Sequence, residues 1–202
     1  MLGPNGAGKS SLFSMIALIQ SRSAGDIAIN GVPIERFDPA LHALGIVPQY
    51  NALWDTLTVN EHFQVVGQLK GLNKNRLQLQ RELFSQVLNL QAFGDRKAQF
   101  LSGGNKRKLQ TVVAMLGNAQ ILMLDEPSAG MDPISRKRLY SHWRAMTNQS
   151  LILITQRIEE AEIICDNIAL MANGQFQDFG PPAQLKQKHG KGYQLKLELC
   201  HL

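Results

Sequence analysis

The sequence predicts an α/β fold, with a mostly parallel sheet as its core and a helical subdomain inserted into that core. Three observations support this prediction. A glycine-rich turn near the start of the chain leads into a helix, and apolar runs of strand length alternate with helical segments in the second half. Between these parts, at about residues 51–117, apolar residues recur at helical spacing. At 202 residues we expect a single domain, residues 1–202.

The glycine-rich turn has the pattern G-x-x-x-x-G-K-S of a P-loop, which predicts a P-loop NTPase fold. In this loop the backbone N–H groups turn inward around phosphate oxygens, Lys9 adds a positive charge, and the Ser10 hydroxyl holds Mg²⁺. A helix over residues 10–20 would point its positive end at the phosphate. The expected nucleotide-binding residues are Gly3, Pro4, Asn5, Gly6, Ala7, Gly8, Lys9, Ser10 and Ser11.

The elements after the P-loop begin with two short strands, at residues 26–30 and 44–48. A helix then begins at Thr58, because Thr58 and Glu61 have the spacing of a capping box. A second helix is predicted over residues 75–88. The apolar residues that we expect to share a face of this second helix are Leu79, Leu83 and Val87.

The second half of the chain reads as strands alternating with helices, which implies a parallel core. The expected strands are 121–124, 151–155, 168–171 and 175–179, and the expected helices are 133–147, capped by Asp132, and 158–164. Asn173-Gly174 between the last two strands suits a type I′ hairpin. The tail alternates apolar and polar residues from Tyr193, so about 190–202 is expected to start a C-terminal extension.

Two acidic residues follow the strand at residues 121–124. An apolar strand that ends in carboxylates is what a magnesium nucleotide site requires at the edge of a sheet. We expect Asp125 to hold Mg²⁺ and Glu126 to polarise the attacking water as a general base. Together with a P-loop, this pair is a specific indication of nucleotide hydrolysis.

A second anion site is predicted at Ser102, Gly103 and Gly104, which precede an apolar-periodic helix. A simple helix cap is the alternative. Two phosphate-binding sites in one small domain make sense if the second site serves the nucleotide of a neighbouring molecule.

Composition excludes several classes of protein. Apolar residues make up 44% of the chain, but no apolar run approaches the roughly 20 residues that span a bilayer. No signal peptide is visible, and Cys165 and Cys200 have no motif spacing, which indicates a reducing compartment. The net charge of +5 would suit nucleic acid or an acidic membrane, but a solvated surface explains it more simply.

In order and spacing, these motifs resemble the ATP-binding cassette of ABC transporters. The segments that carry the resemblance are residues 3–10, Gln49, residues 101–105, residues 121–127 and residues 128–132. The resemblance covers essentially the whole chain. Residues 105–109 and the sequence around Asp125 look most like subfamily A, whose members are large eukaryotic proteins, mostly lipid exporters.

The resemblance implies an ABC ATPase fold and a chain that hydrolyses MgATP as one half of a head-to-tail cassette dimer. Each ATP would lie between the P-loop of one chain and the Ser102 motif of the other. The implied partners are a second cassette and the transmembrane domains of a transporter, at the cytoplasmic face of a membrane. A lipid would be the indirect substrate, and no nucleic acid is expected.

The resemblance also assigns roles to single residues. Gln49 would contact Mg²⁺ and the attacking water, so the expected catalytic residues are Gln49, Glu126 and Gln156, and the expected metal ligands are Ser10, Gln49 and Asp125. Asp132 would lie at the dimer seam. Trp54 either lines the groove for a transmembrane coupling helix or belongs to the core.

Two departures from the family pattern leave alternatives open. The family places a histidine after the last core strand, where this chain has Gln156, which donates a hydrogen bond but carries no charge. Because only Met1 and Leu2 precede the P-loop in this sequence, we also expect the strand that feeds it to be absent and the N-terminal antiparallel sheet to be largely missing. These departures favour one alternative, a catalytically weakened regulatory cassette. The positive charge alone supports another, a soluble ABC-type ATPase that acts on nucleic acid or ribosomes.

Overall fold

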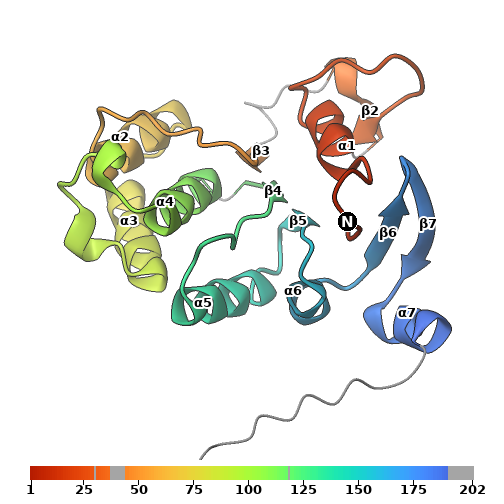
Figure 1. The fold of residues 1–202 in the computed structure, drawn as a ribbon. Helices are drawn as coiled ribbons and strands as arrows, with labels where there is room; N and C mark the ends of the chain where they lie inside the picture. The colour runs from red at the N-terminus through yellow and green to blue at the C-terminus, as the bar shows by residue number, and fades with distance from the viewer. Residues whose placement is uncertain (30, 37–43, 118, 191–202) are drawn as a thin grey trace, which may run out of the picture.

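A parallel sheet forms the centre of the computed structural model, which describes residues 1–29, 31–36, 44–117 and 119–190 (Figure 1). Its strands are β3 (Leu44–Val47), β4 (Ile121–Asp125) and β5 (Ser150–Ile154), in the order β3-β4-β5. β4 pairs in parallel with both neighbours, so that Leu44 lies opposite Ile121 and Ile121 opposite Ser150. The predicted parallel core is confirmed, with strand bounds within one residue of those expected.

Helices cover both faces of this sheet because the central strand is apolar on both sides. On one face, Met123 packs with Phe13 of α1 (Lys9–Ile16). On the other face, Leu122 and Leu124 pack in one cluster with Leu139 of α5 (Pro133–Arg144). α1 is shorter than the expected 10–20 because Leu18 adopts a left-handed conformation (φ 58°) that ends the helix.

The first two residues continue the sheet, which corrects the expectation that the strand before the P-loop is absent. Leu2 forms parallel bridges to Thr155 on one side and to Leu170 on the other. Its N–H donates to the Ala169 carbonyl (2.9 Å), and its carbonyl accepts from the Met171 N–H (2.9 Å). Met1 and Leu2 thereby join β5 to the hairpin at the far end of the sheet.

That hairpin consists of β6 (Ile168–Ala172) and β7 (Gln175–Gly180), which pair antiparallel. Asn173 and Gly174 both have positive φ (51° and 76°), as a type I′ turn requires.

The remaining elements of this half are α6 (Ile158–Ile164) and α7 (Pro182–His189). Two short strands, β1 (Ala28–Ile29) and β2 (Val32–Pro33), pair antiparallel after α1. The predicted strand in the tail from Tyr193 lies outside the described residues.

The segment between β3 and β4 is helical, as predicted, and lies at the opposite end of the sheet from the hairpin (Figure 1). It holds α2 (Val59–Leu69), α3 (Lys74–Leu88) and α4 (Gly103–Met115), with 3-10 turns at Gln91–Phe93 and Ala98–Phe100. The capping box at the start of α2 is confirmed: Glu61 N–H donates to Thr58 Oγ1, and Thr58 N–H donates to the Glu61 carboxylate. None of the helices in the described parts of the chain has the length and apolar composition of a membrane span.

The buried face of α3 differs from the predicted one. Leu79 and Leu83 are 66% and 47% exposed, whereas Phe84 and Leu88 are buried in the main core cluster. The helical period was predicted correctly, but either apolar stripe of this helix could have faced inward. Trp54 is 48% exposed and therefore does not belong to the core.

Candidate functional site

The P-loop wraps around the start of α1 and is held from outside by the β6–β7 hairpin. Gly8, the N-cap of α1, has a φ of 94°, a left-handed conformation that favours glycine. The Gly174 N–H at the hairpin turn donates to the Ala7 carbonyl (3.0 Å). The phosphate-binding shape predicted from the glycine pattern is therefore supported by residues from the other end of the chain.

Lys9 is buried at the centre of this loop, where its amino group is held by the loop's own carbonyls. Nζ donates to the carbonyls of Gly3 (2.8 Å) and Pro4 (2.9 Å). A lysine ammonium has three protons to donate. The third proton of Lys9 is therefore the one that an anion in the loop can receive.

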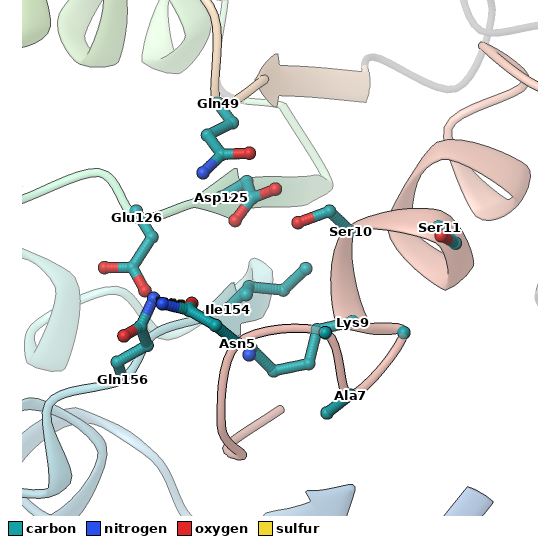
Figure 2. A pocket seen from close by; sticks show the side chains of 12 residues that line it. Asn5, Ala7, Lys9, Ser10, Ser11, Gln49, Asp125, Glu126, Ile154 and Gln156 are labelled. Atoms are coloured by element: carbon teal, nitrogen blue, oxygen red, sulfur yellow. Dashed lines mark hydrogen bonds between the residues drawn. The ribbon is translucent and has the colours of Figure 1, made fainter. Parts of the chain in front are cut away.

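A cavity of about 270 Å³ lies against the loop (Figure 2). In Figure 2 the side chains of Ser10, Asp125 and Gln49 point toward a common space, with Glu126 and Gln156 at its other side. Ser11 lies further along α1, at the rim of the cavity. The lining residues are Asn5, Gly6, Ala7, Gly8, Lys9, Ser10, Ser11, Gln49, Asp125, Glu126, Ile154 and Gln156.

The two acids carry carboxylate oxygens that no described protein group satisfies. Asp125 Oδ1 and Glu126 Oε1 are buried without a hydrogen-bond partner. Carboxylate, hydroxyl and amide oxygens are the hard ligands that Mg²⁺ prefers, and nucleotide phosphates complete its shell. The unsatisfied Asp125 oxygen, with the Ser10 hydroxyl and the Gln49 amide nearby, therefore fits a bound Mg²⁺.

Glu126 sits in an unusual conformation and environment. Its φ is 49°, in the left-handed region, and its N–H donates to the Ile154 carbonyl (2.9 Å). Burial raises the pKa of the Glu126 carboxyl, and the nearby Glu160 carboxylate raises that pKa further, while a backbone hydrogen bond from Gln156 acts against both. Strained backbone and a raised carboxyl pKa at a cavity are typical of a catalytic base.

Gln156 occupies the position where the resemblance stated above implies a histidine. Its Nε2 donates to Asn5 Oδ1 on the P-loop (2.6 Å), as the dashed line in Figure 2 shows. The amide thus closes the cavity on the side of Glu126. Asn5 and Gln156 both belong to the predicted site, but no pattern in the sequence indicates the bond between them.

Ser102, Gly103 and Gly104 lie apart from this cavity, at the N-terminus of α4. Ser102 caps the helix by accepting from the Asn105 N–H (3.3 Å). A Cβ at Gly104 would lie 2.4 Å from the Gly130 carbonyl oxygen, so only glycine allows this close approach. The predicted second site is therefore geometrically separate from the first within one chain.

Asp132, predicted at the dimer seam, caps α5 and pairs with α4. Its carboxylate accepts from the Ser135 N–H (2.8 Å) and lies 2.6 Å from Lys108 Nζ. The Lys108 ammonium holds the pKa of Asp132 well below its usual range. This pair ties the Ser102 end of α4 to the loop after Glu126.

Arg107 and Gln110 were not predicted as site residues, but they are buried in α4 and contact the backbone around Gln49 and Glu126. In the sequence, Arg107 stands between Lys106 and Lys108, and such a run of basic residues is typical of a solvent-exposed surface. No local signal separates the buried arginine from its neighbours.

Comparisons with known proteins agree with this geometry. The family model described as "ABC transporter" matches residues 1–129. The chain is 38% identical over 197 residues to ABC transporter A family member 12 of Arabidopsis thaliana, covering 96% of this chain and 22% of the relative. It is 36% identical over 207 residues to the human "Cholesterol transporter ABCA5", covering 98% of this chain and 12% of that protein. It thus spans at most about a fifth of the length of these relatives.

Solved structures show the fold. An ATP binding subunit of an ABC transporter superposes with a TM-score of 0.85 at 24% identity, covering 94% of this chain and 80% of that one. A dimeric ATP-binding cassette in a post-hydrolysis state with ADP and Pi gives 0.80 at 18% identity, covering 90% and 83%. The fold is that of ABC ATPases, and with the family match and the subfamily A relatives, the chain belongs to the ABC transporter family.

Proposed function

We propose that this chain binds and hydrolyses MgATP at the P-loop cavity, as the nucleotide-binding domain of a membrane exporter. The observation that carries the proposal is the convergence of Lys9 and Ser10 with Asp125 and Glu126, two acids with unsatisfied buried oxygens, on one cavity. This combination of a phosphate cradle, metal ligands and a base is what phosphoryl transfer to water requires.

In this proposal the P-loop binds the phosphates through its backbone N–H groups, with Lys9 donating its remaining proton to the β- and γ-phosphates. Ser10, Asp125 and Gln49 would hold Mg²⁺, which would supply positive charge against the negative charge that develops on the phosphates. Asn5, Gly6, Ala7, Gly8 and Ser11 complete the cradle.

Glu126 accepts the proton of the attacking water. Its raised pKa makes it a stronger proton acceptor than an exposed glutamate. Gln49 orients the same water, and Gln156 donates an amide proton toward the γ-phosphate, while its bond to Asn5 keeps it at the cavity wall. The neutral amide stabilises the transition state less than a charged donor would, because charge-assisted hydrogen bonds are roughly twice as strong.

A second cassette completes the site. The separation of the Ser102 segment (residues 101–105) from the P-loop cavity supports a head-to-tail dimer, in which Ser102, Gly103 and Gly104 contact the ATP of the other chain. Residues 1–202 would form one domain, with residues 51–117 as its helical subdomain. The relative named as a cholesterol transporter supports lipid export, with transmembrane partners and the domain at the cytoplasmic face of a membrane.

The test is Glu126→Gln in the native full-length polypeptide, with the exposed Glu159→Gln as the matched control. ATP turnover should fall by about 10²–10⁴-fold while ATP still binds, because only the base is removed. Glu159→Gln should hydrolyse ATP normally. Equal turnover in wild type and Glu126→Gln would contradict the proposed base.

A second candidate function, a regulatory cassette that binds ATP without turning it over, is favoured by the uncharged Gln156. Labelled nucleotide trapped under turnover conditions separates the two functions, because a site that hydrolyses holds ADP and a regulatory site holds ATP. We expect ADP, and we expect Gln156→His to raise kcat up to about tenfold through a charge-assisted bond. Trapped ATP, with no gain from Gln156→His, would favour regulation.

A further inference from the structure

Arg107 is a buried charge whose contacts all serve the backbone of the nucleotide site. It is 8% exposed on α4. Its guanidinium donates to the carbonyls of Pro48 (2.7 Å), Glu126 (2.9 and 3.1 Å) and Asp125, and to Gln110 Oε1 (3.1 Å). A buried cation is stabilised only where its donors are satisfied, so this set of acceptors holds Arg107 in one place.

Those carbonyls belong to the segments that carry the proposed catalytic groups. Pro48 directly precedes Gln49, and Asp125 and Glu126 are the acids at the end of β4. Arg107 therefore fixes the loop of Gln49 and the acidic strand end relative to one another and to α4.

Gln110, one turn further along α4, adds a second contact to the same loop. Its Nε2 donates to the Tyr50 carbonyl (2.9 Å) and lies 3.4 Å from the Pro48 carbonyl. The backbone is thus held on both sides of Gln49. Because Gln110 also accepts from Arg107, the two side chains form one connected unit.

We propose that Arg107 and Gln110 are positioning residues for hydrolysis, which set Gln49 and Glu126 relative to bound nucleotide and connect them to the Ser102 segment. The inference rests on the proposed function. Ser102 caps the same helix. A shift of the Ser102 segment against a partner's ATP would therefore move Arg107 and Gln110, and with them the backbone at Gln49 and Glu126. In this way α4 would couple the two nucleotide sites of a dimer.

A lysine could not replace this arginine. Separate guanidinium nitrogens reach Pro48 and Glu126, one on each side of the planar fork. A lysine ammonium keeps the charge but donates from a single atom and cannot span the two carbonyls. Gln110→Glu is a second, isosteric variant, since it keeps the acceptor for Arg107 but loses the donor to Tyr50.

The experiment uses the native full-length polypeptide with Arg107→Lys, Gln110→Glu and the control Arg76→Lys, an exposed arginine of α3. It measures kcat, the Mg²⁺ concentration for half-maximal turnover, binding of a fluorescent ATP analogue without Mg²⁺, and the melting temperature. We expect Arg107→Lys to lower kcat roughly ten- to a hundredfold and to raise the Mg²⁺ requirement, because displacing catalytic groups by about 1 Å has such effects. Nucleotide binding without Mg²⁺ should stay within about twofold, because the P-loop is untouched.

Gln110→Glu should change kcat and the Mg²⁺ requirement in the same direction but less, and Arg76→Lys should match wild type. Unchanged kcat and Mg²⁺ requirement in Arg107→Lys would overturn the inference, as would a parallel loss of binding, kcat and melting temperature, which indicates a merely structural role. If Arg107→Lys does not fold, Gln110→Glu decides alone by the same criteria. A wild type without hydrolysis would refute the proposed function, whereas a hydrolysing wild type matched by both variants refutes only this inference.

Discussion

Glu126 combines an unusual backbone conformation with a carboxylate that faces the cavity. Its backbone is left-handed, its N–H is bonded to Ile154, and its carbonyl accepts from Arg107. These contacts hold a conformation that costs an ordinary residue of the order of 1–3 kcal/mol. The side chain is thereby directed into the cavity with one carboxylate oxygen unsatisfied, ready to accept a hydrogen bond from water.

The pH dependence of turnover is expected to reflect the buried Glu160 carboxylate near Glu126. Glu126 must be deprotonated to act as a base, so activity falls as the pH drops through its raised pKa. Glu160, which is 1% exposed and accepts from Thr155 Oγ1 (2.5 Å), contributes to that raised pKa by charge repulsion. Glu160→Gln removes the repulsion, so we expect the acidic limb of the pH–kcat profile to move to lower pH.

The matched control is Glu159→Gln, an exposed neighbour on the same helix. The acidic limb of the pH–kcat profile of Glu159→Gln should coincide with that of wild type in the same steady-state assay. An acidic limb that stays in place in Glu160→Gln, or one that moves upward, would show that Glu160 does not raise the pKa of the base.

At the scale of elements, the N-terminus of α4 is fixed by a close backbone approach and by an ion pair. Gly104 lies against the Gly130 carbonyl, and Lys108 pairs with Asp132 just beyond it. The Ser102 segment and the loop after Glu126 are therefore held against each other. This connection complements the contacts of Arg107 with the Asp125 and Glu126 carbonyls.

Gly104→Ala should destabilise the domain, because its new Cβ would lie 2.4 Å from the Gly130 carbonyl oxygen. We expect a loss of about 1–3 kcal/mol in the free energy of unfolding, typical of overpacking against backbone. Gly103→Ala meets no atom within 4 Å and should be neutral or slightly stabilising in the helix. Chemical denaturation of both variants tests the pair, and equal stabilities would contradict the close approach.

Elements with local signals could be predicted from the sequence. The P-loop glycines, the capping box at Thr58 and the Asn173-Gly174 turn each specify their own backbone conformation, and all three are found where expected. The buried face of α3 could not be predicted because both of its stripes contain leucine. Arg107 could not be recognised because its acceptors, such as the Pro48 carbonyl 59 residues away, are brought to it only by the fold.

At the scale of the whole molecule, residues from both ends of the described chain complete one sheet. Leu2 lies between β5 and β6, and the hairpin turn then supports the P-loop through the Gly174–Ala7 bond. Loss of this junction would separate the hairpin from the parallel core. The expectation of a missing strand failed because a two-residue segment forms the ladder bonds that the site requires.

Leu2→Pro tests this junction, because proline has no N–H to donate to the Ala169 carbonyl. We expect the free energy of unfolding to fall by about 1–3 kcal/mol and MgATP affinity to fall with it. Leu2→Val keeps the backbone donor and should retain both properties. Calorimetry and nucleotide titration measure them, and a Leu2→Pro protein with wild-type affinity would show that the P-loop does not depend on the hairpin.

The same junction constrains the order in which the parts of this domain can fold. The Met1 nitrogen and the Leu153 carbonyl that it contacts (2.5 Å) are 152 residues apart in sequence. Pairings between such distant segments form late, since the intervening chain must first be made and brought together. The P-loop is therefore expected to gain the support of the hairpin late in folding, once residues 168–180 have paired with Leu2.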